Sequence, residues 1–226
     1  CFNLSYLRFK FIGLLVKKKL GLFGGRFDPV HRAHLAMATA AANQFKLDEI
    51  RWIVTGKPVH KKTFASAQQR LEMVSLALKD LSDKRMKLDD IEVLASLEGQ
   101  ANPTYKTIQA LKTNHPKAEF LWLLGEDQLV NFKTWQNWEW LIENIGIAVC
   151  CRPNISQTMQ YSTFETQKKF FKLKNKKLVC IEMLPDDCSS TKVREFISKG
   201  QPTFDLITSS VEEFIIKNKL YINYER

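Results

Sequence analysis

Short apolar runs recur along the chain at the length of β-strands. The clearest span residues 19–24, 49–54, 119–125 and 145–151, and weaker ones span 86–93 and 177–184. Runs of this length with few polar residues are typical of strands that are buried on both faces of a sheet. We therefore expect a sheet built from these segments.

The segments between these runs carry apolar residues at helical spacing. The spacing predicts helices over residues 34–45, 66–81, 104–114, 134–144, 189–199 and 209–218. Capping boxes at Ser66 and Gln69, and at Ser162 and Glu165, mark two helix starts. In the helix at 66–81 the expected buried face consists of Leu71, Val74, Leu78 and Leu81.

Strand and helix alternate, which predicts an α/β fold: a Rossmann-like, doubly wound parallel sheet with helices on both faces. Residues 17–226 are expected to form a single domain. Residues 1–16 are expected to be a leader outside it, because their short apolar run is followed by three lysines. Ligands of such sheets bind beyond the carboxyl ends of the strands. Glycines, histidines, arginines and serines of this chain cluster at those ends.

Composition narrows the class of partner. The 226 residues carry a net charge of +10, which favours an anionic partner, either nucleic acid or a phosphorylated small molecule, although a merely solubilising surface explains the charge equally well. The apolar run before Lys17 is too short to span a bilayer, so no membrane partner is expected. Five cysteines without a C-x-x-C pair favour reduced thiols and a cytoplasmic location.

The stretch "GLFGGRFDPVHRAH" at residues 21–34 is the most unusual part of the chain. It matches neither the dinucleotide nor the P-loop glycine pattern, and the chain has no G-x-S-x-G nucleophile motif. His31 and His34 share a helical face, but a metal site would need a third ligand that the sequence does not supply nearby. An anion site remains, made from backbone N–H groups, two imidazoles and a helix N-terminus.

Six ordered motifs carry a family resemblance. "GGRFDPVHRAH" and "SSTKVR" (189–194) are similar to the two signatures of the nucleotidyltransferase superfamily. Between them stand "PVHKK", "PTYKT", "LLGEDQLVNFKTW" and "VCCRP", which resemble the nicotinate mononucleotide adenylyltransferase family in order and spacing. The resemblance covers residues 19 to 222 and implies transfer of the adenylyl group of ATP to nicotinate mononucleotide, giving deamido-NAD and pyrophosphate in NAD biosynthesis.

The resemblance also implies roles for residues of this chain. His34, His31 and Arg194 become the catalytic residues that meet the ATP phosphates, with Ser190 in support. The wider ATP site consists of Gly24, Gly25, Arg26, Phe27, His31, His34, Gly125, Asp127, Ser189, Ser190, Thr191 and Arg194. The mononucleotide site consists of His60, Thr104, Tyr105, Thr107, Asp127, Trp135, Gln136 and Arg152. Magnesium would be carried on the ATP phosphates, with no metal site in the protein itself.

Several interpretations stay open. Asp127 could cap the following helix, Trp135 could be a helix core residue, and Arg26 could point to water. Arg26 and Ala33 also depart from the family, which usually has threonine or serine, and often glycine, at these positions. The acceptor could be nicotinamide mononucleotide or another phosphate ester, and a basic nucleic-acid-binding domain is a more distant alternative. Whether the protein is a monomer or a homo-oligomer is not decided by these patterns.

Overall fold

The computed structural model describes residues 17–58, 63–100, 102–151, 159–174, 176–184 and 186–225. The expected leader at 1–16 and two predicted site residues, His60 and Arg152, lie outside these ranges. Within them, six parallel strands form one sheet in the order β3-β2-β1-β4-β5-β6. This is the strand order of the doubly wound Rossmann fold, so the predicted fold class is confirmed.

The strands lie where the apolar runs predict them. They are β1 (Lys19–Gly25), β2 (Glu49–Val54), β3 (Met86–Asp89), β4 (Glu119–Gly125), β5 (Gly146–Cys151) and β6 (Leu178–Glu182). The third strand is shorter than expected. Asp89 Oδ1 accepts a hydrogen bond from the Ile91 N–H at 3.1 Å, and this turn starts a helix where the sequence pattern predicts more strand.

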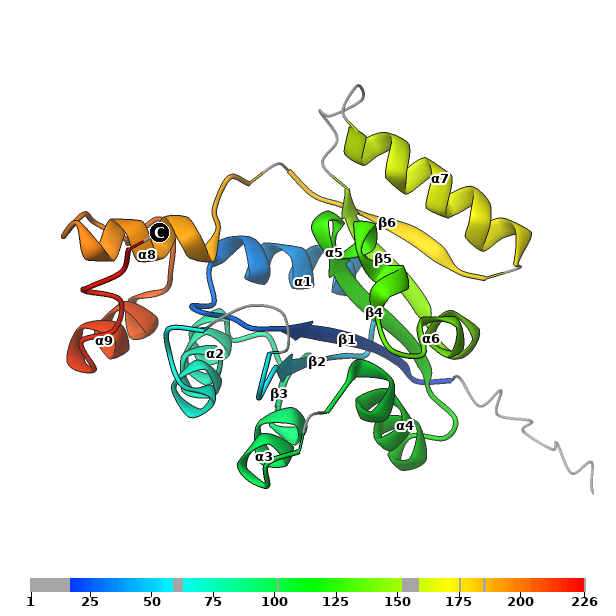
Figure 1. Cartoon of the computed structure of the whole chain (residues 1–226), viewed down its shortest axis with the longest axis horizontal. Coiled ribbons are helices and arrows are strands. Elements are labelled where there is room, and N and C mark those ends of the chain that lie inside the picture. Colours follow the sequence, from blue (N-terminus) through cyan, green and yellow to red (C-terminus); the bar gives the residue numbers. More distant parts are fainter. Residues whose placement is uncertain are drawn as a thin grey trace, which may run out of the picture.

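Helices follow most strands (Figure 1). They are α1 (Arg32–Gln44), α2 (Ala67–Leu81), α3 (Ile91–Leu97), α4 (Thr104–Asn114), α5 (Glu126–Val130), η1 (Phe132–Thr134), α6 (Trp138–Asn144), α7 (Met159–Leu173), α8 (Ser190–Ser198) and α9 (Ser209–Lys217). The short helices α3 and α5 are not predicted by the sequence pattern. The helix expected at 134–144 is broken at Asn137, whose φ of 55° is left-handed, so α6 begins only at Trp138.

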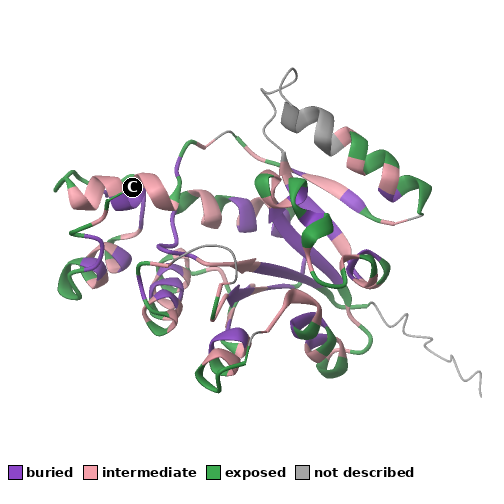
Figure 2. Ribbon diagram, viewed as in Figure 1, coloured by how far each residue is buried: buried purple, intermediate pink, exposed green. Residues whose placement is uncertain are grey.

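Each face of the sheet carries its own hydrophobic core (Figure 2). One core contains the α1 and α2 residues Met37, Ala38 and Val74, and the other contains Ile108 of α4 and Leu141 of α6. The fully buried residues of α2 are Arg70, Met73, Val74 and Ala77. Of the four residues expected on the buried face of α2, only Val74 is fully buried. Leu71, Leu78 and Leu81 are partly buried and pack against the margin of the core.

The strand order places β1 beside β4, with Leu22 opposite Trp122 in the middle of the two strands. The carboxyl ends of β1 and β4 therefore lie side by side. The chain reverses its winding direction between these strands, which is where doubly wound sheets bind ligands. No helix in the described ranges is both long and apolar enough to cross a membrane. Among the described cysteines Cys150 and Cys188 are not in a disulfide, but Cys180 is disulfide-bonded, so the expectation of reduced thiols is wrong there.

Candidate active site

The two glycines at the end of β1 make room for aromatic rings. A Cβ on Gly24 would lie 2.5 Å from Cζ2 of Trp122, and one on Gly25 would lie 2.9 Å from Cζ of Phe27. Both distances are too short for a real side chain. Phe27 itself has a φ of 50°, so the chain turns sharply just after the strand. Packing therefore explains both glycines, and their expected contact with ATP stays a prediction.

His31 and His34 form a stacked pair at the start of α1. Their ring centroids lie 3.7 Å apart, and the His31 N–H donates to Nδ1 of His34 at 3.2 Å. Burial, with a smaller effect from Arg32, lowers the pKa of His31 to about 3. Burial and the neighbouring His31 hold the pKa of His34 well below its usual value. Both rings are therefore neutral near pH 7, and because Nδ1 of His34 is an acceptor, its proton resides on Nε2.

Arg194 enters the site from α8. Its Nη1 donates to the Asp28 carbonyl at 2.6 Å, and its Nη2 donates to Thr191 Oγ1 at 3.2 Å. The guanidinium carbon lies 4.7 Å from the Phe64 ring centroid and 4.6 Å from that of Tyr224. These contacts hold the Arg194 guanidinium next to the loop that carries the two histidines.

A second arginine lies near Arg194. Burial lowers the pKa of Arg26, Asp28 opposes this shift, and the charge of Arg194 adds to it. Asp127 is also close enough to raise the pKa of Arg26. The partly buried Arg26 is therefore near enough to Arg194 and Asp127 for their charges to affect it, and it is not an arginine that simply points to water.

The serine-threonine turn fastens α8 to the loop after β1. Ser189 caps α8 by accepting from the Lys192 N–H at 3.2 Å, while the Ser190 hydroxyl donates to the Pro29 carbonyl at 2.9 Å. These side chains thus have partners inside the protein. Their expected contact with phosphate stays a prediction.

Gly125 and Asp127 lie at the end of β4. The N-cap residue of α5 is Gly125, and Asp127 does not cap this helix. The Asp127 carboxylate is exposed and accepts from Gln128 at 2.9 Å. The capping alternative is therefore wrong, and the ribose contact of Asp127 stays a prediction.

Trp135 lies between η1 and α6 and not inside a helix. Its ring packs 5.3 Å from that of Phe132 and 6.4 Å from that of Trp122, and it is only partly buried. Trp135 is therefore not a helix residue, but its ring does pack against the core, and its predicted contact with the mononucleotide stays a prediction. The neighbouring Gln136 is exposed.

The first turn of α4 contains Thr104, Tyr105 and Thr107. Thr107 is fully buried, and its hydroxyl donates to Glu92 Oε1 at 2.8 Å. The Lys106 N–H bonds to the Pro103 carbonyl at 2.9 Å. The N–H groups of Thr104 and Tyr105 come before this bond, where an α-helix has no internal partner for them. An anion bound at the amino end of α4 would therefore accept hydrogen bonds from the N–H groups of Thr104 and Tyr105.

Comparisons with known proteins agree with this geometry. A sequence profile described as Cytidylyltransferase-like matches residues 22–196. A "Probable nicotinate-nucleotide adenylyltransferase" of Bordetella petrii is 31% identical over 207 residues, covering 90% of this chain and 99% of that protein. One of the same name from Neisseria meningitidis serogroup B is 35% identical over 210 residues, covering 90% and 98%. The chain belongs to the nicotinate-nucleotide adenylyltransferase family. The resemblance and the enzyme class expected from the motifs are thereby confirmed.

Solved structures support the fold of this adenylyltransferase family. Nicotinic acid mononucleotide adenylyltransferase from Plasmodium falciparum, complexed with APC, superposes with a TM-score of 0.70 at 23% identity, covering 92% of this chain and 98% of that one. The same enzyme complexed with NaAD gives a TM-score of 0.70 at 22% identity. At this level of identity the likeness shows the shared fold.

Sequence reasoning missed several residues of this adenylyltransferase site because their partners are distant in the chain. Buried Asp28 accepts hydrogen bonds from the Tyr221 hydroxyl and from the backbone near Phe64. Buried Arg70 donates to the Arg26 carbonyl at 2.8 Å. Asp28 stands inside the first signature, which was a usable signal, whereas nothing local marks Arg70 or Tyr221.

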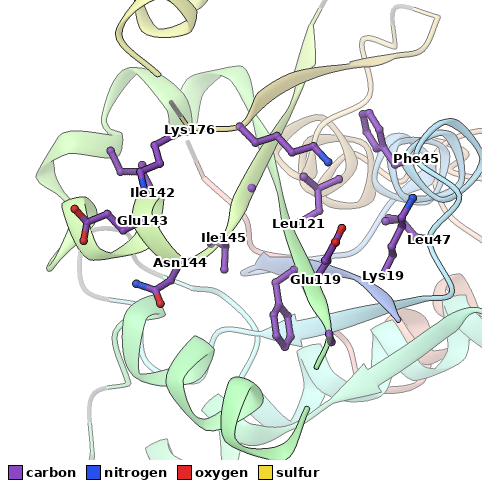
Figure 3. Close-up of a pocket in the computed structure, with 14 residues that line it drawn as sticks. Lys19, Phe45, Leu47, Glu119, Leu121, Ile142, Glu143, Asn144, Ile145 and Lys176 are labelled. Carbon is purple, nitrogen blue, oxygen red and sulfur yellow. The ribbon is translucent and has the colours of Figure 1, made fainter. Parts of the chain in front are cut away.

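A cavity of about 560 Å³ lies at the amino ends of β1, β4 and β5 (Figure 3). It is lined by Lys19, Glu119 and Gly146, the first residues of β1, β4 and β5. The motifs that follow β1 and β4 lie at the other ends of these strands. This cavity is therefore separate from the candidate active site.

In the described ranges no three His, Cys, Asp or Glu side chains are grouped so that they could hold a metal ion.

Proposed function

We propose that this adenylyltransferase uses the cluster at the ends of β1 and β4 to transfer the adenylyl group of ATP to nicotinate mononucleotide. The observation that carries the proposal is the loop after β1, which carries the His31–His34 pair. Its Asp28 carbonyl binds the Arg194 guanidinium, and Arg26 is near enough to Arg194 for the two charges to interact. Two guanidinium groups and two imidazoles in one partly buried place favour a polyphosphate. The names of the relatives point to the same reaction.

The chemistry requires positioning and charge stabilisation. An oxygen of the mononucleotide 5′-phosphate attacks the ATP α-phosphorus, and the bond from that phosphorus to the bridging oxygen breaks to release pyrophosphate. The attacking oxygen is already ionised, so the protein need not remove a proton. His34 supplies a neutral Nε2–H donor for charge on the transferring group, while Arg194 and Arg26 balance charge on the departing pyrophosphate.

The acceptor is held on the β4 side of the cluster in this proposal. Trp135 stacks on the pyridine ring, and the N–H groups at the start of α4 meet its carboxylate with help from Lys106. Asp127 accepts hydrogen bonds from ribose hydroxyls. His60 and Arg152 remain predictions for the mononucleotide phosphate, because both lie outside the described residues.

Magnesium is carried on the ATP phosphates in this proposal. The described residues offer no grouped set of protein ligands for a resident ion, whereas the triphosphate supplies the oxygens that Mg²⁺ prefers. The ion would neutralise phosphate charge, and the chain's own residues would orient the triphosphate. A cytoplasmic location and the oligomeric state stay open to experiment.

The test is pyrophosphate release from ATP and magnesium with a panel of acceptors. Nicotinate mononucleotide should support the fastest release, and nicotinamide mononucleotide or other phosphate esters should be poorer. Release with another phosphate ester alone would identify a sibling transferase. RNA retention that vanishes in moderate salt would not support the nucleic-acid alternative, because any strongly basic protein can bind that way.

A further inference from the structure

The end of the chain turns back into the protein after α9, and it lies beside α8 (Figure 1). Two non-glycine residues of this turn have left-handed backbones, Lys219 with a φ of 51° and Tyr221 with a φ of 63°. Such conformations are costly for residues with a side chain and persist where the surroundings hold them. The turn sends the Tyr221 side chain inward, and only 7% of this residue is exposed.

Tyr221 reaches the loop that carries the histidine signature. Its hydroxyl donates to Oδ1 of Asp28 at 2.7 Å. The same carboxylate accepts from the Ala65 N–H at 3.1 Å and, through Oδ2, from the Phe64 N–H at 2.7 Å. Burial and the Asp28 charge raise the pKa of Tyr221, so the phenol keeps its proton and stays a donor. Asp28 therefore joins the chain end to the segment before α2.

The backbone of Asp28 is bound to the phosphate-site arginine. The Asp28 carbonyl accepts from Arg194 Nη1 at 2.6 Å, so one residue holds Tyr221 by its side chain and Arg194 by its backbone. Tyr224 makes a second connection: its hydroxyl accepts from Arg194 Nη2 at 3.4 Å, and its ring lies 4.6 Å from the guanidinium carbon. The chain end thus contacts both the loop and the arginine.

We propose that residues 219–225 form a C-terminal clamp that positions Arg194 and the histidine loop for ATP, with Tyr221 and Tyr224 as positioning residues. The inference rests on the proposed function, because it assumes that Arg194 meets polyphosphate. Neither tyrosine is assigned a contact with substrate. The Tyr221 hydroxyl fixes Asp28, and Asp28 fixes the Arg194 guanidinium through its carbonyl. The Tyr224 ring and hydroxyl contact the same guanidinium.

Tyr221→Phe tests the clamp with little change in packing, because the ring stays and one hydroxyl is lost. We expect kcat/KM for ATP to fall about tenfold or more, the effect of losing a hydrogen bond to a charged group, with KM for the mononucleotide nearly unchanged. The matched control is Thr203→Val, which removes a buried hydroxyl bonded to Glu212 near α9 but outside the clamp. The control should lose stability without losing kcat/KM for ATP.

A double-mutant cycle with Asp28→Asn separates positioning from general destabilisation. If Tyr221 acts through Asp28, the double variant should be little worse in kcat/KM than Asp28→Asn alone. Fully additive losses would overturn the clamp, as would an unchanged kcat/KM in both Tyr221→Phe and Tyr224→Phe.

Binding of inorganic tripolyphosphate provides a readout without turnover. Calorimetry should show weaker binding to Tyr221→Phe than to the parent and to Thr203→Val, and equal binding to all three would contradict the clamp. A parent that releases no pyrophosphate with any mononucleotide would instead contradict the proposed function. Failure of the clamp and failure of the proposed function therefore give different results.

Discussion

The hydroxyl of Thr107, in the first turns of α4, donates to Oε1 of Glu92 in α3 at 2.8 Å, and both residues are buried. Asn102 donates in turn to Thr107 Oγ1 at 3.1 Å. This chain of hydrogen bonds fixes the amino end of α4, where the proposed function puts the nicotinate carboxylate. The Thr107 hydroxyl thus orients the helix, and the predicted contact of Thr107 with the mononucleotide stays a prediction.

Glu92 should make stability depend on pH. Burial, with a smaller effect from Asp89, raises its pKa from 4.5 to about 7. The folded protein therefore keeps this proton where the unfolded chain loses it, so the contribution of Glu92 to the free energy of unfolding is full below about pH 4.5 and declines as the pH rises to about 7. Glu92→Gln should lack this decline, so the variant gains on the parent by about 3 kcal/mol across the window. Urea unfolding at several pH values measures the difference, and parallel curves would contradict the shift.

The histidine pair should give the opposite dependence. The pKa of His31 is lowered from 6.5 to about 3, so the unfolded chain binds a proton that the folded protein refuses. The contribution of His31 is full above about pH 6.5 and is lost as the pH falls toward 3. His31→Asn should flatten the acid limb of the stability curve. Equal acid limbs in the parent and in His31→Asn would exclude the pKa shift.

His34 should matter for turnover more than for binding. The His34→Ala variant loses the neutral donor that meets charge on the transferring phosphorus, a charge that grows in the transition state. We expect kcat to fall about 100-fold or more, with a small change in KM for nicotinate mononucleotide. Arg194→Lys should act in the same direction while keeping a positive charge in the buried site. A folded His34→Ala protein with nearly normal kcat would contradict the assignment.

Arg26 should contribute to ATP binding. It departs from the residue usual in the family, and it lies close enough to Arg194 and Asp127 to be affected by their charges. We expect Arg26→Thr to raise KM for ATP several-fold, because a cation is lost from the phosphate site. Lys87→Thr, an exposed position on β3, is the control for the change in net charge. An unchanged KM for ATP in Arg26→Thr would contradict this role of Arg26.

Trp135 should support the preference for the nicotinate form of the mononucleotide. A stacked ring is indifferent to acid or amide, so the preference must come from donors at α4, and charge-assisted hydrogen bonds of this kind support about a tenfold to hundredfold ratio of kcat/KM. Trp135→Ala should lower kcat/KM for both mononucleotides and leave KM for ATP nearly unchanged. Trp138→Phe, whose ring lies 6.0 Å from that of Phe170, is the control. Full activity in Trp135→Ala, or equal efficiency of the parent on both mononucleotides, would argue for a sibling transferase.

The sequence alone was sufficient for the strands, most helices and the edge of the sheet that carries the site. The bounds expected at 49–54, 104–114 and 119–125 agree with the structure at both ends. Local patterns succeed here because a buried strand or an amphipathic helix is specified by side chains close together in the chain. The sequence pattern did not predict the short helices α3 and α5. An Asp residue precedes α3 and a Gly residue precedes α5, and both helices are too short to show a helical period.

Only the tertiary structure decided how the site is held together. Tyr221 and Asp28 are separated by 193 positions, yet their side chains are 2.7 Å apart. Arg70 reads as a solvated charge in a helix, but it is buried because the carbonyl groups of Arg26 and Gly56 accept its hydrogen bonds. A buried charge is tolerated only where such partners converge on it. That convergence depends on the packing of distant segments, which no local pattern of residues encodes.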